Sequence, residues 1–431
     1  MFSSFRKRLK HLVTASAVML ASFGQMNAAR ADGLFSGADL FSAQRFSGHA
    51  DLRLGLANGE PSWLDGGFGK ARFGADNDGA DAHATLAEAS LVWKPVFAWP
   101  IEGYVHAQYN GEQDDEFDLV EAYATYRAPP FKAGRFKARA GMFFPPVSLE
   151  HEQNAWRTVY SITPSAINTW IGEEVLVAGA EATFERSIGE HKISATGAAF
   201  GFNDTSGTVL SWRGWALHDL KTAAFSDWPL PDRPLGLFPT VFSFQAPRTE
   251  PFREVDDRVG YYYRVDWRAP RIVALNVFRY KNRGDGTSAE KGQISWETSF
   301  TDFGLTLDLS ENTIVLAQGL FGRTYFGRFE PPIVDVKFAA AYALINHSWG
   351  AHSLTERVDW FETTDQTFVA LDNNNERGWA TTTAYSYTLN EHNRLMAEFM
   401  RIESDRPTRA EAGLDPEQDQ IVFQINWRLG F

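Results

Sequence analysis

Apolar and polar residues alternate along most of the chain. The clearest example is VGYYYRVDW at 259–267, where Tyr261 and Val265 share one face and Arg264 lies on the other. A period of two is the pattern of a β-strand, whose successive side chains point to opposite sides. Segments of this kind predict about sixteen strands. We expect them at 46–57, 86–94, 101–110, 118–128, 135–143, 174–186, 191–203, 258–268, 271–281, 293–308, 313–326, 333–348, 351–363, 377–388, 391–404 and 419–431.

The connections between these predicted strands fall into two classes. Those after even-numbered strands are short, such as SENT, WGA and NEH. Those after odd-numbered strands are mostly long, at 58–85, 144–173, 204–257, 282–292, 364–376 and 405–418. An up-and-down meander sorts its turns in this way when its two ends face different environments. The sequence therefore predicts an all-β fold, an up-and-down antiparallel β-barrel of about sixteen strands.

Hydropathy points to a membrane crossed by strands rather than by helices. The chain has 431 residues, 44% of them hydrophobic, and its mean hydropathy is −0.30. After the N-terminus it holds no run of about 20 apolar residues, which excludes a bundle of transmembrane helices. The opposite face of many predicted strands is charged or polar. A polar interior with an apolar exterior is expected of a barrel whose exterior contacts lipid.

Tryptophans support this orientation. Of the 14 tryptophans, five lie near the short-turn ends of their predicted strands: Trp93, Trp99, Trp267, Trp349 and Trp427. Although tryptophan is common in strands generally, a shared position at one end is typical of the aromatic girdle at a membrane interface.

The N-terminus has the pattern of an export signal. A basic start, MFSSFRKRLKH, precedes the short apolar segment LVTASAVMLASFG and the small residues Ala29 and Ala31. We therefore expect cleavage after Ala31, so that 1–31 is a signal peptide and 32–431 is the mature barrel domain. Its removal changes the net charge from −13 to −18. An exported protein this acidic is a poor candidate for nucleic-acid binding.

Motifs for catalysis or metal binding are missing from the sequence. The chain has no cysteine, which excludes disulfides and cysteine-ligated metals. In SLEHE, His151 has Ala155 four residues later, where a zincin helix needs a second histidine. There is no GxSxG or P-loop. We therefore predict that the chain is not an enzyme and binds no cofactor or metal.

About sixteen strands enclose a lumen too wide for side chains alone to fill, so selectivity is expected from whatever narrows it. The candidate is the loop at 144–173. Folded inward, it would place Glu150, His151, Glu152 and Arg157 in the channel; folded outward, it is a surface loop. The loop at 204–257 is expected to cap the mouth or to hold a short helix around GWALHDLKTAAF.

Cations recur on the face of the strands that we expect to line the lumen. They are Arg127, Arg135, Lys137, Arg139 and Arg264, with Asp266 close to the last. A column of cations in a pore wall favours the passage of anions. The alternative is that these residues are the mixed charge of any aqueous lumen.

The whole arrangement resembles a known family. The segments EAYATYRAPPFKAGRFKARAGMFFPPVSLE, TIVLAQGLFGR and HSLTERVDWF and the final Phe431 are similar to Gram-negative outer-membrane porins, in particular the sixteen-stranded phosphate-selective porins O and P. The resemblance implies a trimer, passive diffusion of small hydrophilic solutes, and arginines along the pore. Only Arg135, Lys137 and Arg139 stand near the matching place, and one of these is lysine.

The C-terminal strand, IVFQINWRLGF, alternates up to its last residue. Ile425, Trp427 and Phe431 form one row, expected to face lipid, and Gln424 and Arg428 face the other way. The resemblance further implies that Phe431 is read by the outer-membrane assembly machinery. The expected function is a diffusion channel for small hydrophilic solutes or ions in the outer membrane of a Gram-negative bacterium. The alternatives are a barrel enzyme, a surface adhesin without a pore, or a soluble exported β protein.

Overall fold

The computed structural model describes residues 38–75, 79–231, 242–270, 272–327, 332–367 and 372–431. The predicted signal peptide, 1–31, lies outside the described residues. Sixteen long strands form one sheet together with the short β3 (Val96–Ala98). The long strands are β1 (Phe46–Asn58), β2 (Ala80–Trp93), β4 (Ile101–Tyr109), β5 (Phe117–Arg127), β6 (Arg135–Phe143), β7 (Val177–Ile188), β8 (His191–Gly201), β11 (Gly260–Arg268), β12 (Val273–Lys281), β15 (Glu297–Ser310), β16 (Thr313–Phe326), β17 (Val334–Trp349), β18 (His352–Asp365), β19 (Glu376–Asn390), β20 (Asn393–Asp405) and β21 (Glu417–Gly430).

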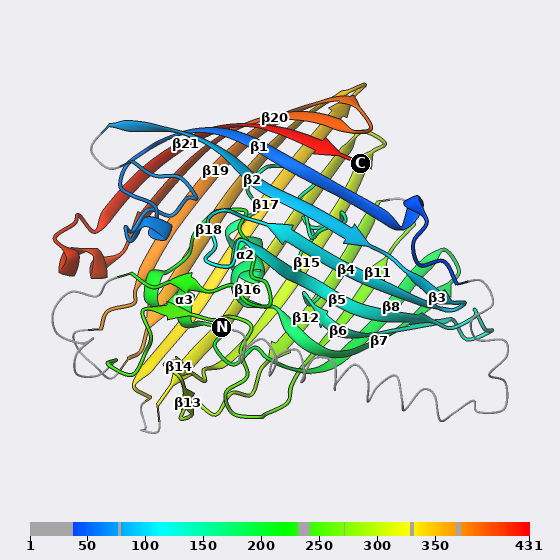
Figure 1. The fold of residues 1–431 in the computed structure, drawn as a ribbon, viewed down its shortest axis with the longest axis horizontal. Coiled ribbons are helices and arrows are strands. Elements are labelled where there is room, and N and C mark those ends of the chain that lie inside the picture. The colour runs from blue at the N-terminus through cyan, green and yellow to red at the C-terminus, as the bar shows by residue number, and fades with distance from the viewer. Residues whose placement is uncertain (1–37, 76–78, 232–241, 271, 328–331, 368–371) are drawn as a thin grey trace.

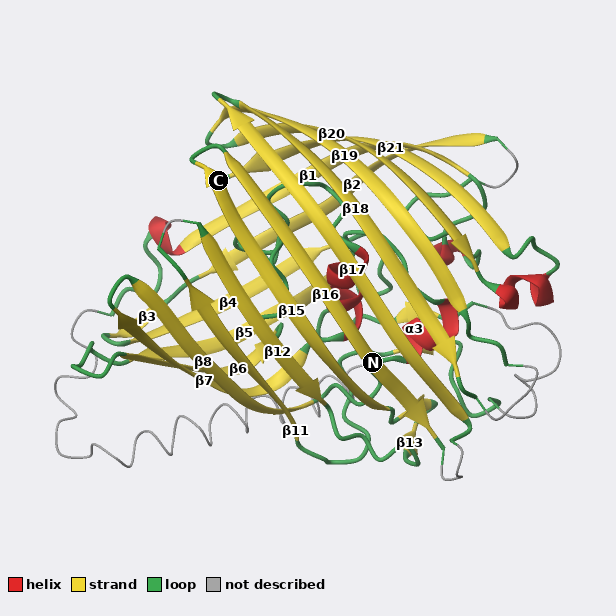
Figure 2. Cartoon of the chain, turned by 180° about the vertical axis from the view of Figure 1, so that it is seen from behind, coloured by secondary structure: helices red, strands yellow, loops and turns green. Residues whose placement is uncertain are grey.

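The sheet closes on itself. Each long strand pairs antiparallel with the next along the chain, and β21 pairs with β1 in the register Leu52↔Trp427. Figures 1 and 2 show the tilted strands running around the barrel. Closure leaves no unpaired sheet edge, as a barrel in lipid requires. The predicted fold class and strand number are confirmed.

Other elements lie in the long connections. They are the helices α2 (Ala166–Glu174) and α3 (Thr208–Arg213), the 3-10 turns η2 (Ala43–Arg45), η3 (Trp63–Asp65) and η4 (Pro407–Ala412), and the two-residue strands β9 (Trp228–Pro229), β10 (Arg248–Thr249), β13 (Ala289–Glu290) and β14 (Gln293–Ile294). The helix predicted around GWALHDLKTAAF is wrong in position: α3 ends one residue before that segment. Among the described residues, no helix is long and apolar enough to cross a membrane.

The barrel exterior is apolar. Large side chains on it are more than a third exposed, among them Leu54, Val265, Phe321, Phe399 and Ile425. Trp99, Trp267, Trp349 and Trp427 are likewise exposed at the short-turn end. The strands pair only with one another around the wall, so this outer surface contacts whatever surrounds the barrel. It is the surface expected to contact lipid, with a tryptophan girdle at one interface.

Exterior side chains are not the same size all the way round. The middle outward positions of β5, β6, β7 and β8 are mostly alanine and glycine, and the registers place Ala124, Ala140, Ala180 and Ala199 side by side. Nearer the short turns, Phe136, Phe184 and Ile193 are exposed on the same face. The strands on this side, β4–β8, have 9 to 12 residues, whereas β15–β21 have 13 to 16. The barrel therefore has a short wall with small outward side chains in its middle and a long wall with large ones.

The interior differs from the expected polar lumen. In β17 the inward face is the apolar one: Val336, Phe338 and Tyr342 are at most 3% exposed, whereas Lys337 points outward. The apolar face is buried because it packs against α2, where the Trp170 and Phe338 rings lie 5.0 Å apart. An interior that is polar throughout was therefore a wrong prediction, since this wall covers a hydrophobic core inside the barrel.

Candidate functional site: a charged vestibule beneath a filled lumen

The segment after β6 crosses the barrel interior and binds the opposite wall. Leu149 N–H donates to Gln318 of β16 (3.2 Å), Ala166 N–H to Asp359 of β18 (3.1 Å), and Ile162 N–H to Glu398 of β20 (2.7 Å). Figure 1 shows α2, which belongs to this segment, within the ring of strands. Side chains of the far wall thus satisfy the backbone of the loop, as a buried loop requires.

Glu150 belongs to this anchoring and not to an open channel. It is 1% exposed. Its carboxylate accepts hydrogen bonds from Ser165 Oγ (2.6 Å) and Asn168 Nδ2 (2.5 Å), and lies 3.3 Å from the Arg357 guanidinium. Arg357 in turn donates to Asp359 (2.7 Å). The expectation that Glu150 faces the channel is therefore wrong, because the strand wall supplies a buried arginine that neutralises it.

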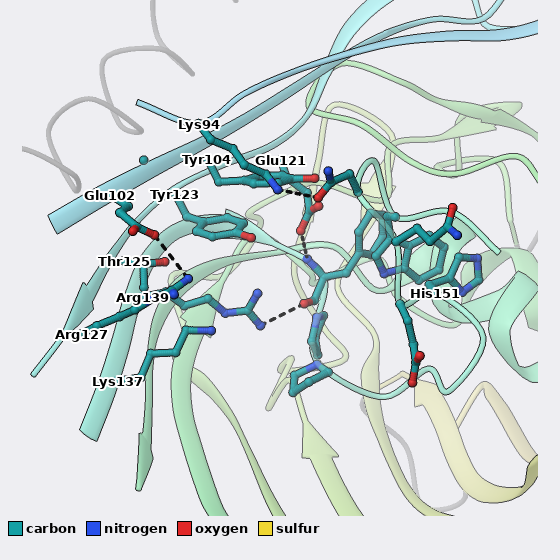
Figure 3. A pocket seen from close by; sticks show the side chains of 18 of the residues that line it. Lys94, Glu102, Tyr104, Glu121, Tyr123, Thr125, Arg127, Lys137, Arg139 and His151 are labelled. Carbon is teal, nitrogen blue, oxygen red and sulfur yellow. Dashed lines mark hydrogen bonds and ion pairs between the residues drawn. The ribbon is translucent and has the colours of Figure 1, made fainter. Parts of the chain in front are cut away.

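Two adjoining cavities lie between this loop and the short-turn end of the barrel. Their volumes are about 440 and 570 Å³. Both are lined by Lys137 and Arg139 of β6 and by Ser148 and Glu152 of the loop. We call the two cavities together the vestibule. Figure 3 shows its first part: β4, β5 and β6 supply most of the labelled side chains, whereas Lys94 and His151 come from the connections after β2 and β6.

The vestibule is rich in charge of both signs. Its cations are Arg45, Lys94, Arg127, Lys137, Arg139, Lys192, Arg264 and Arg268. Its acids are Glu102, Glu121, Glu152, Glu181, Glu185 and Asp266. Cations thus outnumber acids here, although the whole chain has a net charge of −13.

Most of the arginines are neutralised by a neighbour. Arg127 lies 3.3 Å from Glu102, and Arg264 lies 2.6 Å from Asp266. Arg139 binds Glu181, which faces it in the β6–β7 register, through two hydrogen bonds of 2.9 Å. By contrast, in the part of the chain that the structure describes, no acid lies within ion-pair distance of Lys137. Lys137 therefore contributes more free positive charge at the junction of the two cavities than its arginine neighbours.

The residues expected to line the pore separate into two groups. Arg127, Lys137, Arg139, His151, Glu152, Arg264 and Asp266 line the vestibule. Arg135, Glu150 and Arg157 do not: Arg135 is exposed at the start of β6, and Arg157 donates to Gln153 on its own loop (2.5 and 3.0 Å). Strand alternation found the strand residues of the first group, and the inward folding of the loop placed His151 and Glu152 there. Alternation gives no information on how far along a strand the cavity reaches.

Sequence reasoning missed several residues that line the vestibule. Lys94 donates to Asn154 (2.6 Å) and lies over the Tyr104 ring at 5.6 Å. Tyr104 stacks on Tyr123 with ring centroids 4.9 Å apart. The pair could have been predicted, because Tyr104 and Tyr123 are cross-strand partners on the inward faces of β4 and β5. They give one wall of the vestibule a rigid aromatic surface.

Above the vestibule the lumen is filled by protein. Residues 203–225, which we call the inner segment, are almost entirely buried. Thr222 N–H donates to Gly172 O of α2 (2.8 Å), and Thr169 Oγ1 donates to His218 O (3.0 Å). The inner segment therefore wraps α2. The prediction that the loop 204–257 caps the mouth is wrong for this part, which lies inside the barrel.

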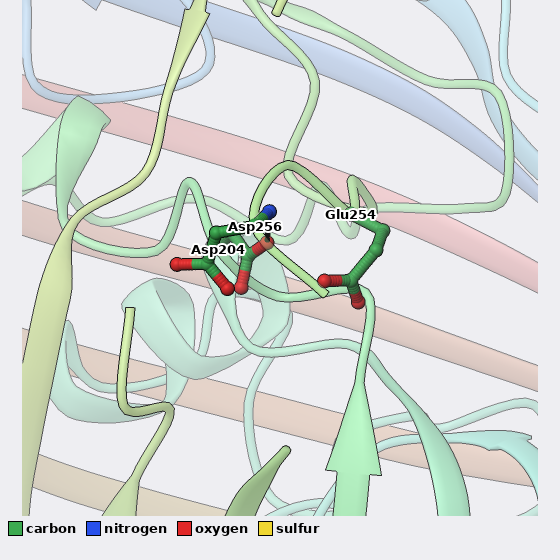
Figure 4. Close-up of side chains that lie close together, drawn as sticks. All are labelled: Asp204, Glu254 and Asp256. Atoms are coloured by element: carbon green, nitrogen blue, oxygen red, sulfur yellow. Dashed lines mark hydrogen bonds between the residues drawn. The ribbon is translucent and has the colours of Figure 1, made fainter. Parts of the chain in front are cut away.

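Three carboxylates gather where the inner segment begins (Figure 4). One oxygen from each of Asp204, Glu254 and Asp256 lies within 4.8 Å of the others. Asp204 accepts hydrogen bonds from the backbone N–H groups of Val255 (2.6 Å) and Asp256 (3.1 Å). Burial, and then the charge of Glu254, raise the pKa of Asp204 to about 8. Protonated Asp204 thus relieves the repulsion in this acidic group.

No protein-family model matches the sequence, and no curated protein matches it. Solved structures do resemble the barrel. One is the outer-membrane channel DcaP of Acinetobacter baumannii, with a TM-score of 0.53, 11% identity, and coverage of 93% of this chain and 99% of that one. Others are the anion-selective porin of Comamonas acidovorans (TM-score 0.48, 10% identity, 91% and 100% coverage) and a loop-deletion mutant of OmpT of Vibrio cholerae (0.49, 8%, 90% and 98%).

One of the predictions needs correction. The prediction that the chain is not an enzyme is wrong as an exclusion, because a shared barrel fold does not decide whether chemistry takes place on it. The narrower likeness to the phosphate-selective porins O and P is not confirmed and stays a prediction. The comparison establishes the fold: the chain is a closed sixteen-stranded barrel of the architecture seen in the outer-membrane channel DcaP.

Proposed function

We propose that the chain is an outer-membrane channel for passive diffusion of small hydrophilic solutes or ions. The observation that carries the proposal is a hollow vestibule lined by charged side chains, inside a barrel whose exterior is apolar. Charge inside and apolar side chains outside suit a barrel that spans lipid and admits polar solutes. In this proposal residues 1–31 direct export and are removed.

We further propose that the channel prefers anions and that Lys137 sets this preference. The support is the pattern of ion pairs. Arg127, Arg139 and Arg264 each pair with a carboxylate, which cancels much of the positive field of the arginine. Among the described residues, Lys137 has no such carboxylate partner. Lys137 also lines both cavities, so a solute passing from one to the other meets its ammonium group. An unneutralised charge at such a junction lowers the energy of anions and raises that of cations.

The test is conductance of the purified full chain in planar bilayers. We expect conductance steps, and a reversal potential in a KCl gradient that indicates anion preference. Lys137→Gln should shift this potential towards cations, and replacing chloride by phosphate shows whether the preference extends to phosphate. Arg135→Gln is the matched control, since it removes one charge from the same strand outside the vestibule. Absence of any conductance contradicts the channel, and an equal shift in both variants contradicts the role of Lys137.

We also propose that the barrel assembles as a homotrimer through its short wall. The alanines and glycines in the middle of β5–β8 make that part of the exterior smooth, whereas the long wall carries large apolar side chains along its strands. In lipid, small side chains let neighbouring protein surfaces approach closely, which gains packing that lipid tails do not provide.

A further inference from the structure

The inner segment, residues 203–225, touches the wall at many points around the barrel. Ser206 O accepts a hydrogen bond from Thr298 of β15, and the Trp215 indole donates to Glu362 O of β18 (3.1 Å). Further along, Ala224 N–H donates to Leu119 O of β5 (2.9 Å). These contacts lie on well-separated strands of the closed sheet. The inner segment therefore spans the cross-section and does not lie along one side.

The close approach of the backbone at Gly207 to side chains of the wall shows how tightly the segment fits. Gly207 has φ = 98°, and a Cβ placed on it would lie 2.1 Å from Thr324 Oγ1 of β16. Together with α2, whose Trp170 packs on Phe300 and Phe338 at 5.2 and 5.0 Å between centroids, the segment occupies the lumen above the vestibule. A hydrated solute leaving the vestibule towards the long loops meets packed side chains.

Charged groups fasten the segment to the wall. Asp219 lies 2.7 Å from Arg53 of β1 and 2.9 Å from Arg72. Lys221 lies 2.9 Å from Glu88 of β2 and donates to Ala155 O (2.9 Å). Ala155 belongs to the loop after β6 that crosses the barrel interior, which we call the crossing loop.

A third attachment lies near β19. Glu376 accepts from Trp215 N–H (2.9 Å) and pairs with Lys70 and with Arg406, which lies 3.4 Å away. Such polar attachments hold a segment in one position, yet buried charge pairs stabilise less than apolar packing of the same volume. Such attachments therefore suit a segment that detaches from the barrel wall and binds it again.

We propose that the inner segment is a gate, and that the structure is the closed state of the channel. This rests on the proposed channel function and adds that conduction requires residues 203–225 to move away from β1, β2 and β19. The attachments through Asp219, Lys221 and Glu376 set how often that happens. When the gate opens, the vestibule becomes continuous with the space at the long-loop end.

The chain has no cysteine, so the gate can be tethered at a chosen point. We would combine Glu88→Cys with Lys221→Cys and join the thiols with a short bis-methanethiosulfonate linker, whose spacer replaces the two long side chains. Bilayer conductance should be lost on linking and return on reduction with dithiothreitol. The matched control is Arg401→Cys with Asp419→Cys, an ion pair of 2.9 Å between the neighbouring wall strands β20 and β21. Linking that pair should leave conductance unchanged.

A second variant opens the gate instead of closing it. Asp219→Asn leaves the Arg53 and Arg72 guanidinium groups without their shared counter-charge, so we expect a rise in open probability of about tenfold, equivalent to one weakened attachment. Heat-modifiable migration on a gel shows that the barrel itself has folded.

The outcomes separate the two proposals. Steady conductance that survives linking of residues 88 and 221 overturns the gate and leaves the channel in place. If no protein shows conductance, including a folded Asp219→Asn barrel and a variant that lacks residues 206–224, both the gate and the channel are overturned.

Discussion

Arg428 of β21 and Asp51 of β1 form a buried ion pair across the seam where the barrel closes. Two hydrogen bonds of 2.7 and 2.6 Å join the guanidinium to the carboxylate, and both residues are less than a tenth exposed. Because the first and last strands meet here, the pair joins the two ends of the folded chain.

Removing one partner of this pair should destabilise the barrel strongly. Asp51→Ala leaves the Arg428 charge buried without a partner, which costs about 3–5 kcal/mol in the free energy of unfolding. Urea unfolding in detergent micelles measures it. The double replacement Asp51→Leu with Arg428→Met should recover most of the loss, whereas Arg401→Ala in the exposed pair with Asp419 should cost far less than Asp51→Ala. A loss at Asp51 no larger than that at Arg401 contradicts the role of the seam pair.

Phe431 is expected to act in assembly more than in stability. Its backbone pairs with Gly48, N–H to O at 3.0 and 3.1 Å, while its side chain is 68% exposed. Phe431→Ser keeps the backbone bonds and removes the apolar ring. We expect little change in refolding from urea into detergent, but a large fall in barrel recovered from outer membranes of expressing cells. Equal effects in the two assays count against recognition by assembly machinery. Phe423→Ser, on the same face of β21, is the matched control.

Stability of the loops around Asp204 should depend on pH. Because folding raises the pKa of Asp204 from 3.8 to about 8, the folded loop holds a proton that the unfolded chain releases. Its stabilising effect is complete below about pH 4, falls as the pH rises to about 8, and changes no further above that. Hydrogen exchange at the Val255 and Asp256 amides, corrected for the intrinsic rate, measures the effect. Asp204→Asn should remove the dependence and Asp257→Asn should retain it.

The short wall makes a prediction about oligomeric state. Ala180→Trp places a large ring in the middle of the smooth surface of β5–β8, and we expect the trimer to dissociate into folded monomers. Unboiled gels and native mass spectrometry report the change. Val358→Trp, on the outward face of the long wall, should remain trimeric. A trimer that tolerates both changes does not use the short wall.

The sequence predicted the wall of this barrel far better than its contents. Strands such as β11 were found because Tyr261 and Val265 alternate with Arg264, and that local pattern is independent of distant residues. The orientation of β17 could not be predicted in the same way, because its inward apolar face is determined by Trp170, far away in the sequence.

The candidate site shows the same division. That Arg139 and Lys137 face inward follows from alternation. That Arg139 is neutralised and Lys137 is not depends on Glu181, which lies opposite Arg139 in the register of β6 and β7. The sequence alone does not give this register. No sequence pattern in the inner segment predicted that it lies inside the barrel. Its partners, such as Glu376 for Trp215 and Arg53 for Asp219, lie more than a hundred residues away.

The hydrogen bonds that join the inner segment and the crossing loop to the barrel wall determine when these two segments can become ordered. Trp215 needs Glu376 of β19, and the crossing loop needs Glu398 of β20 for the N–H groups of Ile162 and Thr163. These acceptors belong to the last strands of the chain. Contacts so distant in sequence form late, after the entropy of closing a long loop has been overcome. The core of this barrel is therefore completed only when its wall is complete, the reverse of a soluble protein that builds its surface around an existing core.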